Sequence, residues 1–465
     1  MIRARSVLIT ALLLSLCGCK VGPNYKRPPA TLPDQFRGVA PDLSTQQQPQ
    51  AAQPFGEMKW FEVFQDKTLD DLIREALTNN YDLRIAASRV MQARAIVGVT
   101  RANQFPQVSA GGSITNERSN FFPGAPTFDN LNISASYILD FWGQYRRATE
   151  AARANLVATE FGQDVVRTTL VTDVASQYFN LRQYDAQLEY SKKTLEADQG
   201  MLKLNTIKFK GGESAETDVL QAQLLVEQAE AQIISLNQLI EQTENAISVL
   251  LGKNPAAVAR GISLTEQPHM PDVPTGLPSS LLERRPDVRQ AEQFLVAANA
   301  NVGVAKAAFF PQFSLTGLFG AQSTSITSFL QGPATFWSIG GQVAQPIFQG
   351  GRIRSNYRLA WAQRDEAELT YKQSVLTAVA DVSNSLVGYS QSRKYRMKIE
   401  EQTQTYFETA RLANVRFNGG ATSFLEVLVT QQQYFESELA LAQAWNSELQ
   451  NYVQLYRSLG GGWQQ

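Results

Sequence analysis

The sequence contains few of the residue types that build enzyme and metal sites. Among its 465 residues there is one histidine, His269, and there are two cysteines, Cys17 and Cys19, both near the N-terminus. This scarcity argues against a Ser-His-Asp triad, a multi-histidine metal site and a disulfide framework in the body of the chain. We therefore expect that the protein is not an enzyme and that it holds no metal and no cofactor.

Charge is also scarce, and neither sign dominates. Only 18% of the residues are charged, and 42 Lys and Arg against 43 Asp and Glu give a net charge of −1. Nucleic-acid-binding domains usually carry a basic excess, so we expect no nucleic-acid partner.

The N-terminus has the pattern of a lipoprotein signal peptide. Arg3 and Arg5 precede an apolar run over 7–14, which is shorter than the roughly 20 residues that a membrane-spanning helix needs. The next residues, Leu16-Cys17-Gly18-Cys19, resemble a bacterial lipobox. They predict removal of residues 1–18 and covalent lipid on Cys19. The alternative is an ordinary signal peptide in which the cysteines are incidental.

The remainder of the chain contains the same pattern twice. Phe105-Pro106-Gln107 recurs as Phe310-Pro311-Gln312, 205 residues later. Phe209-Lys210-Gly211-Gly212 matches Phe417-Asn418-Gly419-Gly420 at an offset of 208. Such agreement indicates an internal duplication. We expect a Pro- and Gln-rich extended tether over 19–57, a first repeat over 58–265 and a second repeat over 266–465.

Each repeat predicts the order helix, two strands, very long helix, glycine turn and return helix. The expected first helices are 68–103 and 277–308, and each ends at a Phe-Pro pair, because the residue before proline is biased away from helix. Proline-free stretches over 144–209 and 352–417 both end at Gly-Gly, a natural helix C-terminus. A helix of this size is about 100 Å long, far longer than a compact domain needs.

The return helix over 216–251 carries a coiled-coil seam. Apolar and small residues recur in steps of four and three over four heptads; they are Ala222, Val226, Ala229, Ile233, Leu236, Ile240, Thr243, Ile247 and Leu250. The segment over 424–459 repeats the seam only loosely. Taken alone, this pattern also fits a soluble coiled-coil rod.

The strand segments alternate between apolar and small polar residues. Over 131–139, Leu131, Ile133 and Tyr137 face one way, and Asn132 and Ser134 face the other. A soluble, half-buried strand would show the same alternation. Three features favour a transmembrane barrel: a length of about 10 residues, an uncharged polar face, and aromatic residues at the strand ends. These interface aromatics are Phe141, Trp142, Phe336, Trp337 and Phe348.

The predicted strand number requires oligomerisation. Two strands per repeat give four per chain, which cannot close a barrel, and an open sheet edge cannot exist in lipid. Bacterial barrels contain an even number of strands, from about eight upward, so two copies of the chain would give eight strands and three copies twelve. The hairpin loops around 121–126 and 332–333 would then face outside the cell.

At this point the sequence resembles the TolC-type outer-membrane efflux factors, in the lipoprotein (NodT-type) subgroup. The resemblance covers the whole mature chain. It rests on Cys19-Lys20-Val21-Gly22-Pro23-Asn24-Tyr25, Trp60-Phe61, Leu69 to Leu83, Arg284-Arg285-Pro286-Asp287-Val288, Phe310-Pro311 and Pro346-Ile347-Phe348 with Gly350-Gly351-Arg352. It implies an α+β membrane protein that forms a homotrimer, with a twelve-stranded β-barrel continued by a periplasmic α-helical barrel of coiled coils.

The same resemblance implies a function and a location. It predicts a passive outer-membrane duct in a Gram-negative bacterium that exports small molecules from an inner-membrane RND-type pump through a periplasmic adaptor. The duct would lie in outer-membrane lipid, anchored through Cys19. Two alternatives remain: the duct of a type I protein secretion system, and a periplasmic coiled-coil lipoprotein without a pore.

The family places its seal and its adaptor contacts at the hairpin tips. The candidate adaptor contacts are Gly211, Gly212, Glu213, Gly419 and Gly420, whose glycines would also allow a sharp turn with positive φ. The candidate periplasmic gate consists of Thr422, Glu426, Thr430 and Asp218. Related members often carry aspartate near positions 422 and 430, so an aspartate ring is absent from those positions here.

The acidic residues of the first tip also have a purely structural interpretation. Glu213, Glu216 and Asp218 would interact favourably with a helix N-terminus. Ser214 is the expected N-cap of that helix.

Overall fold

The structure is a computed structural model that describes residues 20–29, 33, 36, 59–116, 127–267, 281–324 and 334–462. The predicted signal peptide, Cys19, most of the tether, both hairpin loops and His269 lie outside the described residues. Within the described ranges, none of the helices combines the length and apolar character of a membrane span.

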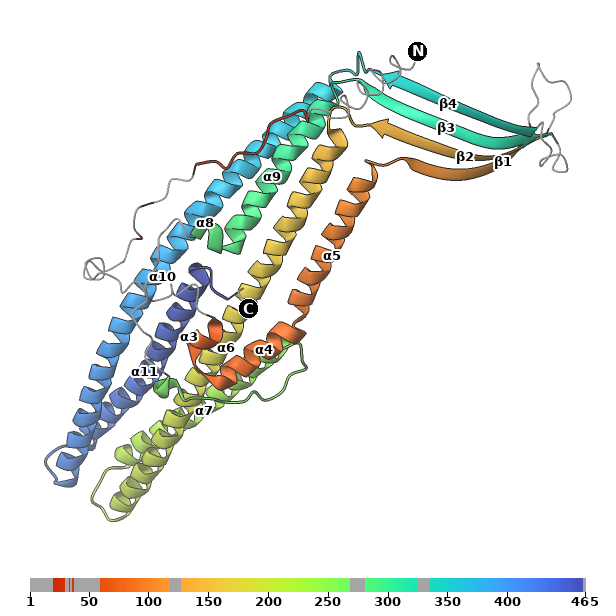
Figure 1. Ribbon diagram of the computed structural model, residues 1–465. Helices are drawn as coiled ribbons and strands as arrows, with labels where there is room; N and C mark the ends of the chain where they lie inside the picture. The colour runs from red at the N-terminus through yellow and green to blue at the C-terminus, as the bar shows by residue number, and fades with distance from the viewer. Residues whose placement is uncertain are drawn as a thin grey trace. The chain divides into compact units, whose positions relative to one another are not determined.

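The elements follow one another in two similar series (Figure 1). The first is α3 Trp60–Phe64, α4 Lys67–Asn79, α5 Tyr81–Ala102, β1 Gln107–Asn116, β2 Thr127–Leu139, α6 Gln144–Lys210 and α7 Glu216–Leu250. The second is the 3-10 helix η2 Leu264–Glu266, α8 Leu281–Arg284, α9 Pro286–Ala307, β3 Gln312–Ser323, β4 Thr335–Ala344, α10 Arg352–Asn418 and α11 Phe424–Ser458. The paired helices have equal lengths: α5 and α9 have 22 residues, α6 and α10 have 67, and α7 and α11 have 35.

Two compact units share these elements. Unit 1 contains residues 1–30, 88–160 and 290–373, and unit 2 contains residues 31–87, 161–289 and 374–465. Each unit therefore takes segments from both halves of the sequence, and the long helices α6 and α10 contribute residues to both units.

The long helices and the strands confirm the sequence patterns to within a few residues. The expected first helices, however, are wrong as single elements, because each is broken. Between α4 and α5, Asn80 has ψ 132°, and its side chain accepts a hydrogen bond from the Leu83 N–H at 3.0 Å while donating to the Leu250 carbonyl at 3.0 Å. In the second series the break falls at Arg285, directly before Pro286, where a following proline disfavours helical backbone.

Unit 2 has an extended apolar core with aromatic rings at its centre. The ring of Phe64 contacts Phe179 and Tyr456 edge-on, with centroids 6.1 and 6.0 Å apart. Edge-to-face contacts of this kind add stabilisation beyond the buried area. The seam of α7 is buried along its length: Ala222, Val226, Ala229, Leu236, Ile240, Thr243 and Ile247 are buried, while Ile233 and Leu250 are partly buried. Of these residues, Ile240, Ile247 and Leu250 pack into the core around Phe64.

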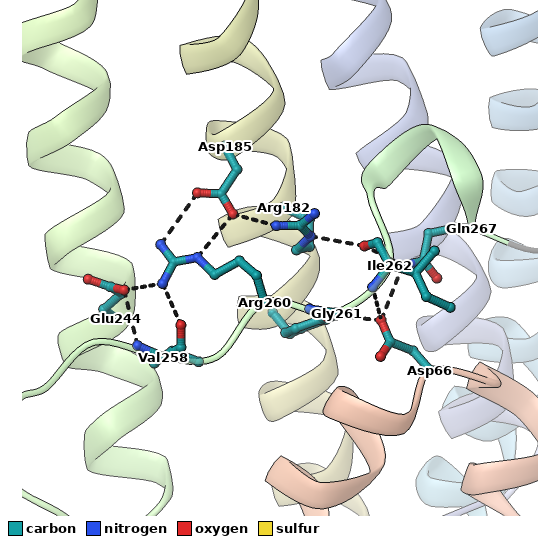
Figure 2. Close-up of polar contacts among 10 residues, drawn as sticks. Asp66, Arg182, Asp185, Glu244, Val258, Arg260, Gly261, Ile262 and Gln267 are labelled. Carbon is teal, nitrogen blue, oxygen red and sulfur yellow. Dashed lines mark hydrogen bonds and ion pairs between the residues drawn. The ribbon is translucent and has the colours of Figure 1, made fainter.

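A polar network holds the segment after α7 against α6 (Figure 2). The Arg260 guanidinium donates to Asp185 at 3.2 Å and also contacts Glu244 and the Val258 carbonyl. Arg182 donates to Asp185 at 2.7 Å and to the Ile262 carbonyl at 3.0 Å. Two cations and two carboxylates therefore fix the path of the chain between the repeats.

Asp66 is the second centre of this network (Figure 2). It caps α4 by accepting hydrogen bonds from the N–H groups of Thr68 and Leu69. The same buried carboxylate accepts from the Tyr178 hydroxyl at 2.7 Å and from the Ile262 N–H at 3.3 Å. One side chain thus connects α4, α6 and the segment before η2.

We predict that Asp66→Ala destabilises the protein by about 2–4 kcal/mol, because it removes a cap and leaves buried donors unpaired. Thermal unfolding of the purified protein would measure the change. Asp71→Ala removes an exposed carboxylate on the same helix that pairs with Lys67; it is the control and should barely shift the transition. Equal transitions for the two variants would contradict the central role of Asp66.

Candidate functional site

The sheet in unit 1 is antiparallel, with its strands in the order β1-β2-β3-β4 (Figure 1). Its register aligns the alternating pattern across all four strands. Ile133 lies opposite Ala110 on β1 and Phe319 on β3, and Phe319 lies opposite Trp337 on β4. Directly opposed residues point to the same side of a sheet, so most apolar residues of the four strands share one face, whereas Phe128, Ile138, Leu318 and Phe336 fall on the other.

That apolar face is uncovered in the protomer. The exposed fraction is 81% for Ile339 and 73% for Trp337, far above that of a packed core. Other exposed members of this face are Val108, Ile114, Leu131, Ile133, Leu315, Phe319 and Val343. Such a contiguous exposed apolar surface marks an interaction with lipid or protein.

The opposite face of the sheet is mainly small, polar and uncharged. Ser109 and Ser134 share a hydrogen bond of 2.8 Å across β1 and β2, and Asn132 donates to Asn130 at 3.1 Å. This face carries no Asp, Glu, Lys or Arg in the four strands. It is suited to water but offers no charged ligand set.

The predicted interface aromatics lie at both ends of the sheet. Phe141 and Trp142 follow β2, where Phe141 contacts Phe313 edge-on with centroids 5.2 Å apart and Trp142 stacks on Phe310 at 4.6 Å. Phe348, 88% exposed, follows β4 on the same side. At the other end, Phe336 and Trp337 are the second and third residues of β4. The register places Trp337 on the apolar face and Phe336, opposite Gly320, on the polar face.

The spacing of these two aromatic rows can be followed along β3. Phe313 and Phe319 are six residues apart on this strand, or about 20 Å at about 3.3 Å per residue. Transmembrane barrels carry aromatic girdles on either side of an apolar band about 25 Å tall. Because transmembrane strands are tilted by about 35–45°, these two residues would lie about 15 Å apart along the membrane normal, which is shorter than a full band.

Both hairpin tips use the same helix-ending turn. At the end of α6, Gly212 has φ +78°, its N–H donates to the Phe209 carbonyl, and the Glu213 N–H donates to the Lys208 carbonyl. Gly420, with φ +71°, and Ala421 repeat this arrangement at the end of α10. This is the Schellman motif, which favours glycine at the left-handed position. Gly211, Gly212, Glu213, Gly419 and Gly420 are all exposed.

The expected N-cap at Ser214 is wrong. Helix α7 begins at Glu216, so that Ala215 occupies the cap position, and the Ser214 hydroxyl is buried without a hydrogen-bond partner among the described residues. The turn that ends α6 extends through Glu213, which shifts the start of α7 by one residue. Glu216 and Asp218 lie in the first turn of α7, where their charge suits the helix dipole.

The structure brings together only part of the candidate gate. Thr422 contacts the Glu426 carboxylate, which also accepts from Arg416 at 2.8 Å. The Thr430 side chain is buried and donates to the Glu426 carbonyl of its own helix at 2.9 Å. Asp218 lies on the other hairpin, at the start of α7. The role of these residues in closing a duct stays a prediction.

A contact between the two hairpin tips was not apparent in the sequence. Ala222, Ala413, Phe424 and Val427 form a small buried cluster with contributions from α7, α10 and α11. Beside it, the Lys208 ammonium lies 4.4 Å from the centre of the Phe417 ring. A cation–π contact of this kind is a weak, specific attraction, and here it joins α6 to α10.

In the half of α6 nearer the hairpin tip, the buried side chains are polar. Between residues 183 and 210, its only buried side chains are Ser191, Asp198 and Asn205. Within the described residues, the Asn205 amide has no hydrogen-bond partner, and Asp198 has neither a hydrogen-bond nor an ion-pair partner. Burial raises the pKa of Asp198 to about 6.

The comparisons with known proteins agree with this geometry. The model of the outer membrane efflux protein family matches residues 72–253 and 277–461. The solvent efflux pump outer membrane protein SrpC of Pseudomonas putida is 35% identical over 461 residues, with 97% of each chain covered. The cation efflux system protein CusC of Escherichia coli K12 is 32% identical over 451 residues, again with 97% of each chain covered.

Solved structures show the same fold. A crystal structure of CusC superposes with a TM-score of 0.85 at 30% identity, covering 96% of this chain and all (100%) of the other. The open-state structure of the MtrE outer membrane channel of Neisseria gonorrhoeae gives 0.86 at 27% identity, covering 96% of this chain and 98% of that one.

The fold and the two-faced sheet therefore define an outer-membrane channel protein of the TolC-like class. The chain belongs to the outer membrane efflux protein family.

We predict opposite outcomes for a charge on the two faces of β2. Ile133→Lys places an ammonium on the apolar face and should cost about 2–4 kcal/mol near the middle of the bilayer. Ser134→Lys, one residue further along on the polar face, is the matched control. The fraction of folded protein recovered in the outer membrane should fall for the first variant only. An equal loss for both would argue against a lipid-facing apolar side.

We also predict that stability depends on pH through Asp198. Its pKa in the folded protein is above the ordinary value near 3.8, so folding favours the protonated form. The free energy of unfolding should fall as pH rises from about 4 to about 6, by at most about 3 kcal/mol. Asp198→Asn should remove this dependence and be the more stable protein at pH 7.

Thermal unfolding at several pH values would test this prediction. Glu230→Gln, which alters an exposed carboxyl on α7, is the control and should leave the wild-type profile unchanged. A wild-type profile that persists in Asp198→Asn would assign the dependence to another group.

Proposed function

We propose that three copies of this chain assemble into a passive duct for the export of small molecules across the outer membrane. The observation that carries the proposal is the register of the sheet, which collects the apolar side chains on one exposed face. In lipid such a face is stable, whereas in water it would be a large exposed hydrophobic patch.

The edges of the sheet support a trimeric barrel. Among the described residues, β1 pairs only with β2, and β4 pairs only with β3. Unpaired backbone N–H and C=O groups are not tolerated in the hydrocarbon region. Pairing β4 of one copy with β1 of the next removes every edge, and three copies give twelve strands continued by the long helices as a helical barrel.

The hairpin tips are the proposed contact with the pump assembly. Their glycine turns are exposed, and at Gly212 and Gly420 nothing lies within 4 Å of the position that a Cβ would occupy. This leaves backbone accessible to a helical hairpin of a periplasmic adaptor, which would join the duct to an inner-membrane pump. SrpC is named for solvent efflux and CusC for cation efflux, so pump partners determine the cargo in this proposal.

We further propose that Cys19 carries lipid, and that the protein is neither an enzyme nor dependent on a cofactor. The lipobox-like sequence before Cys19 supports the first statement. The second is supported by the scarcity of histidine and cysteine in the sequence and by relatives that are named for efflux.

The experiment that tests the duct has two parts. In planar bilayers, the purified trimer should produce stepwise conductance. In a deletion strain, restoring the gene should lower the accumulation of drugs and dyes, and a pump inhibitor should abolish this effect.

Ile133→Lys serves as the assembly-deficient control and Ser134→Lys as the matched charged variant, which should retain both activities. A folded wild-type trimer that shows no conductance would overturn the proposal. Conductance without any effect on accumulation would instead favour a dedicated protein-secretion duct.

A further inference from the structure

The first described residues of the chain are bound to unit 1 along a defined path. The Val21 N–H donates to the Trp142 carbonyl at 3.1 Å, and the Arg147 side chain donates to the Val21 carbonyl at 3.3 Å. The Pro23 carbonyl accepts from the Asn299 amide at 3.0 Å. We call residues 20–27 the N-terminal strap. Its backbone is held by side chains and backbone groups from α6, α9 and the β2–α6 turn.

Arg147 is the first of two charged groups that hold the strap. Its side chain is only 2% exposed, and it donates to the Asn24 side chain at 2.8 Å and to Glu150 at 3.1 Å. Glu150 in turn pairs with Lys20 at 3.4 Å. Because a buried guanidinium needs partners for its donors, the strap completes the coordination of Arg147.

Glu292 on α9 is the second charged group that holds the strap. Its carboxylate accepts two hydrogen bonds from Arg27, at 2.7 and 2.6 Å, and a third from the Tyr25 hydroxyl at 2.9 Å. Bidentate pairs between arginine and a carboxylate are strong and fix orientation as well as distance. Burial and this carboxylate raise the pKa of Tyr25, so its hydroxyl remains a donor at physiological pH.

Two glycines allow the strap to lie directly on α9. Gly22 has φ +102°, and a Cβ at this position would lie 2.5 Å from the Cα atom of Gly303. A Cβ on Gly303 would lie 2.8 Å from the Val21 carbonyl oxygen. Only glycine at both positions permits this approach.

The strap ends at the aromatic row on the helix side of the sheet. The Lys20 Cα lies 3.1 Å from the position of a Cβ on Gly143, next to Trp142. The Trp142 ring stacks on Phe310, and its indole N–H donates to the Pro311 carbonyl at 2.8 Å. The described part of the strap therefore begins next to this aromatic row.

We propose that the N-terminal strap is a positioning device that fixes the lipid-bearing end of the chain at this aromatic row, with Arg147 and Glu292 as its positioning residues. The proposal rests on the proposed lipid attachment at Cys19. The acyl chains and the aromatic side chains then enter the same leaflet of the membrane at the same depth. Lipid on an undocked strap would anchor the chain without aligning the sheet with the bilayer.

The test uses the full-length protein, purified in detergent micelles from cells grown with radioactive palmitate, so that trypsin can reach the strap. Trypsin cleavage after Lys20 or Lys26 separates the label from the rest of the chain. We expect wild type to retain the label, and Glu292→Gln to lose it about tenfold faster, the factor that corresponds to one charge-assisted contact. The exchanged pair Arg27→Glu with Glu292→Arg should restore protection, and Glu366→Gln, an exposed carboxyl of unit 1, should behave as wild type.

A second measurement reports position rather than stability. A bimane fluorophore on Lys20→Cys should be quenched by Trp142, and Trp142→Phe should remove the quenching. Glu292→Gln should also relieve it, and the exchanged pair should restore it.

The outcomes separate this proposal from the one on which it rests. A wild-type chain without palmitate would overturn lipid attachment at Cys19. A labelled wild-type chain that trypsin cleaves as fast as Glu292→Gln would overturn the strap alone. Strong protection together with unquenched bimane would show a strap that is bound but does not place its end at Trp142, and would equally overturn the positioning role.

Discussion

Cross-strand register is the constraint on which the other features of this protein depend. Because Ile133, Phe319 and Trp337 lie side by side on three strands, one face of the sheet is mainly apolar, with Asp129 on it near the end of β2 that follows the hairpin loop. A shift of one residue in any pairing would turn an entire strand over and mix the two faces. Among the described residues, the same alignment leaves β1 and β4 each with one unpaired edge. The hydrocarbon region does not tolerate such edges, which supports the closed ring of strands proposed above.

The two halves of the chain keep the same helix lengths while their interiors differ. In α10, Arg396 is buried, pairs with Glu448 of α11 and lies 4.1 Å from the centre of the Trp445 ring. In the half of α6 nearer the hairpin tip, the buried polar groups Asp198 and Asn205 have no such partners among the described residues. The two repeats therefore share the lengths of their helices, whereas the buried side chains that stabilise each helical hairpin differ between them.

Patterns among neighbouring residues predicted the helices and strands. Features that depend on contacts between residues far apart in the chain could not be predicted from the sequence. Period-two alternation and the Gly-Gly pairs located the strands and the ends of the long helices, because each depends on neighbouring residues. The break at Asn80 depends on the Leu250 carbonyl, and the strap depends on Glu292, far away in the chain. Neither pairing leaves a local pattern. At Ser214 a local pattern gave a wrong prediction. The sequence favoured a helix cap at Ser214, but α7 begins at Glu216 and Ala215 occupies the cap position.

Ring contacts between aromatic side chains and hydrogen bonds of the N-terminal strap occur at the same end of the sheet, next to the helices. Trp142, Phe310, Phe141 and Phe313 gather there through ring contacts, and amphipathic rings favour the boundary between lipid and water. The strap reaches the same place through hydrogen bonds from Arg147 and from the Val21 backbone. An interface of aromatic rings sets the depth of a barrel only loosely, because each ring tolerates some displacement. In the proposal above, the docked strap would restrict the position of the lipid-bearing chain end further, because Arg147 and Glu292 hold it by charge-assisted hydrogen bonds.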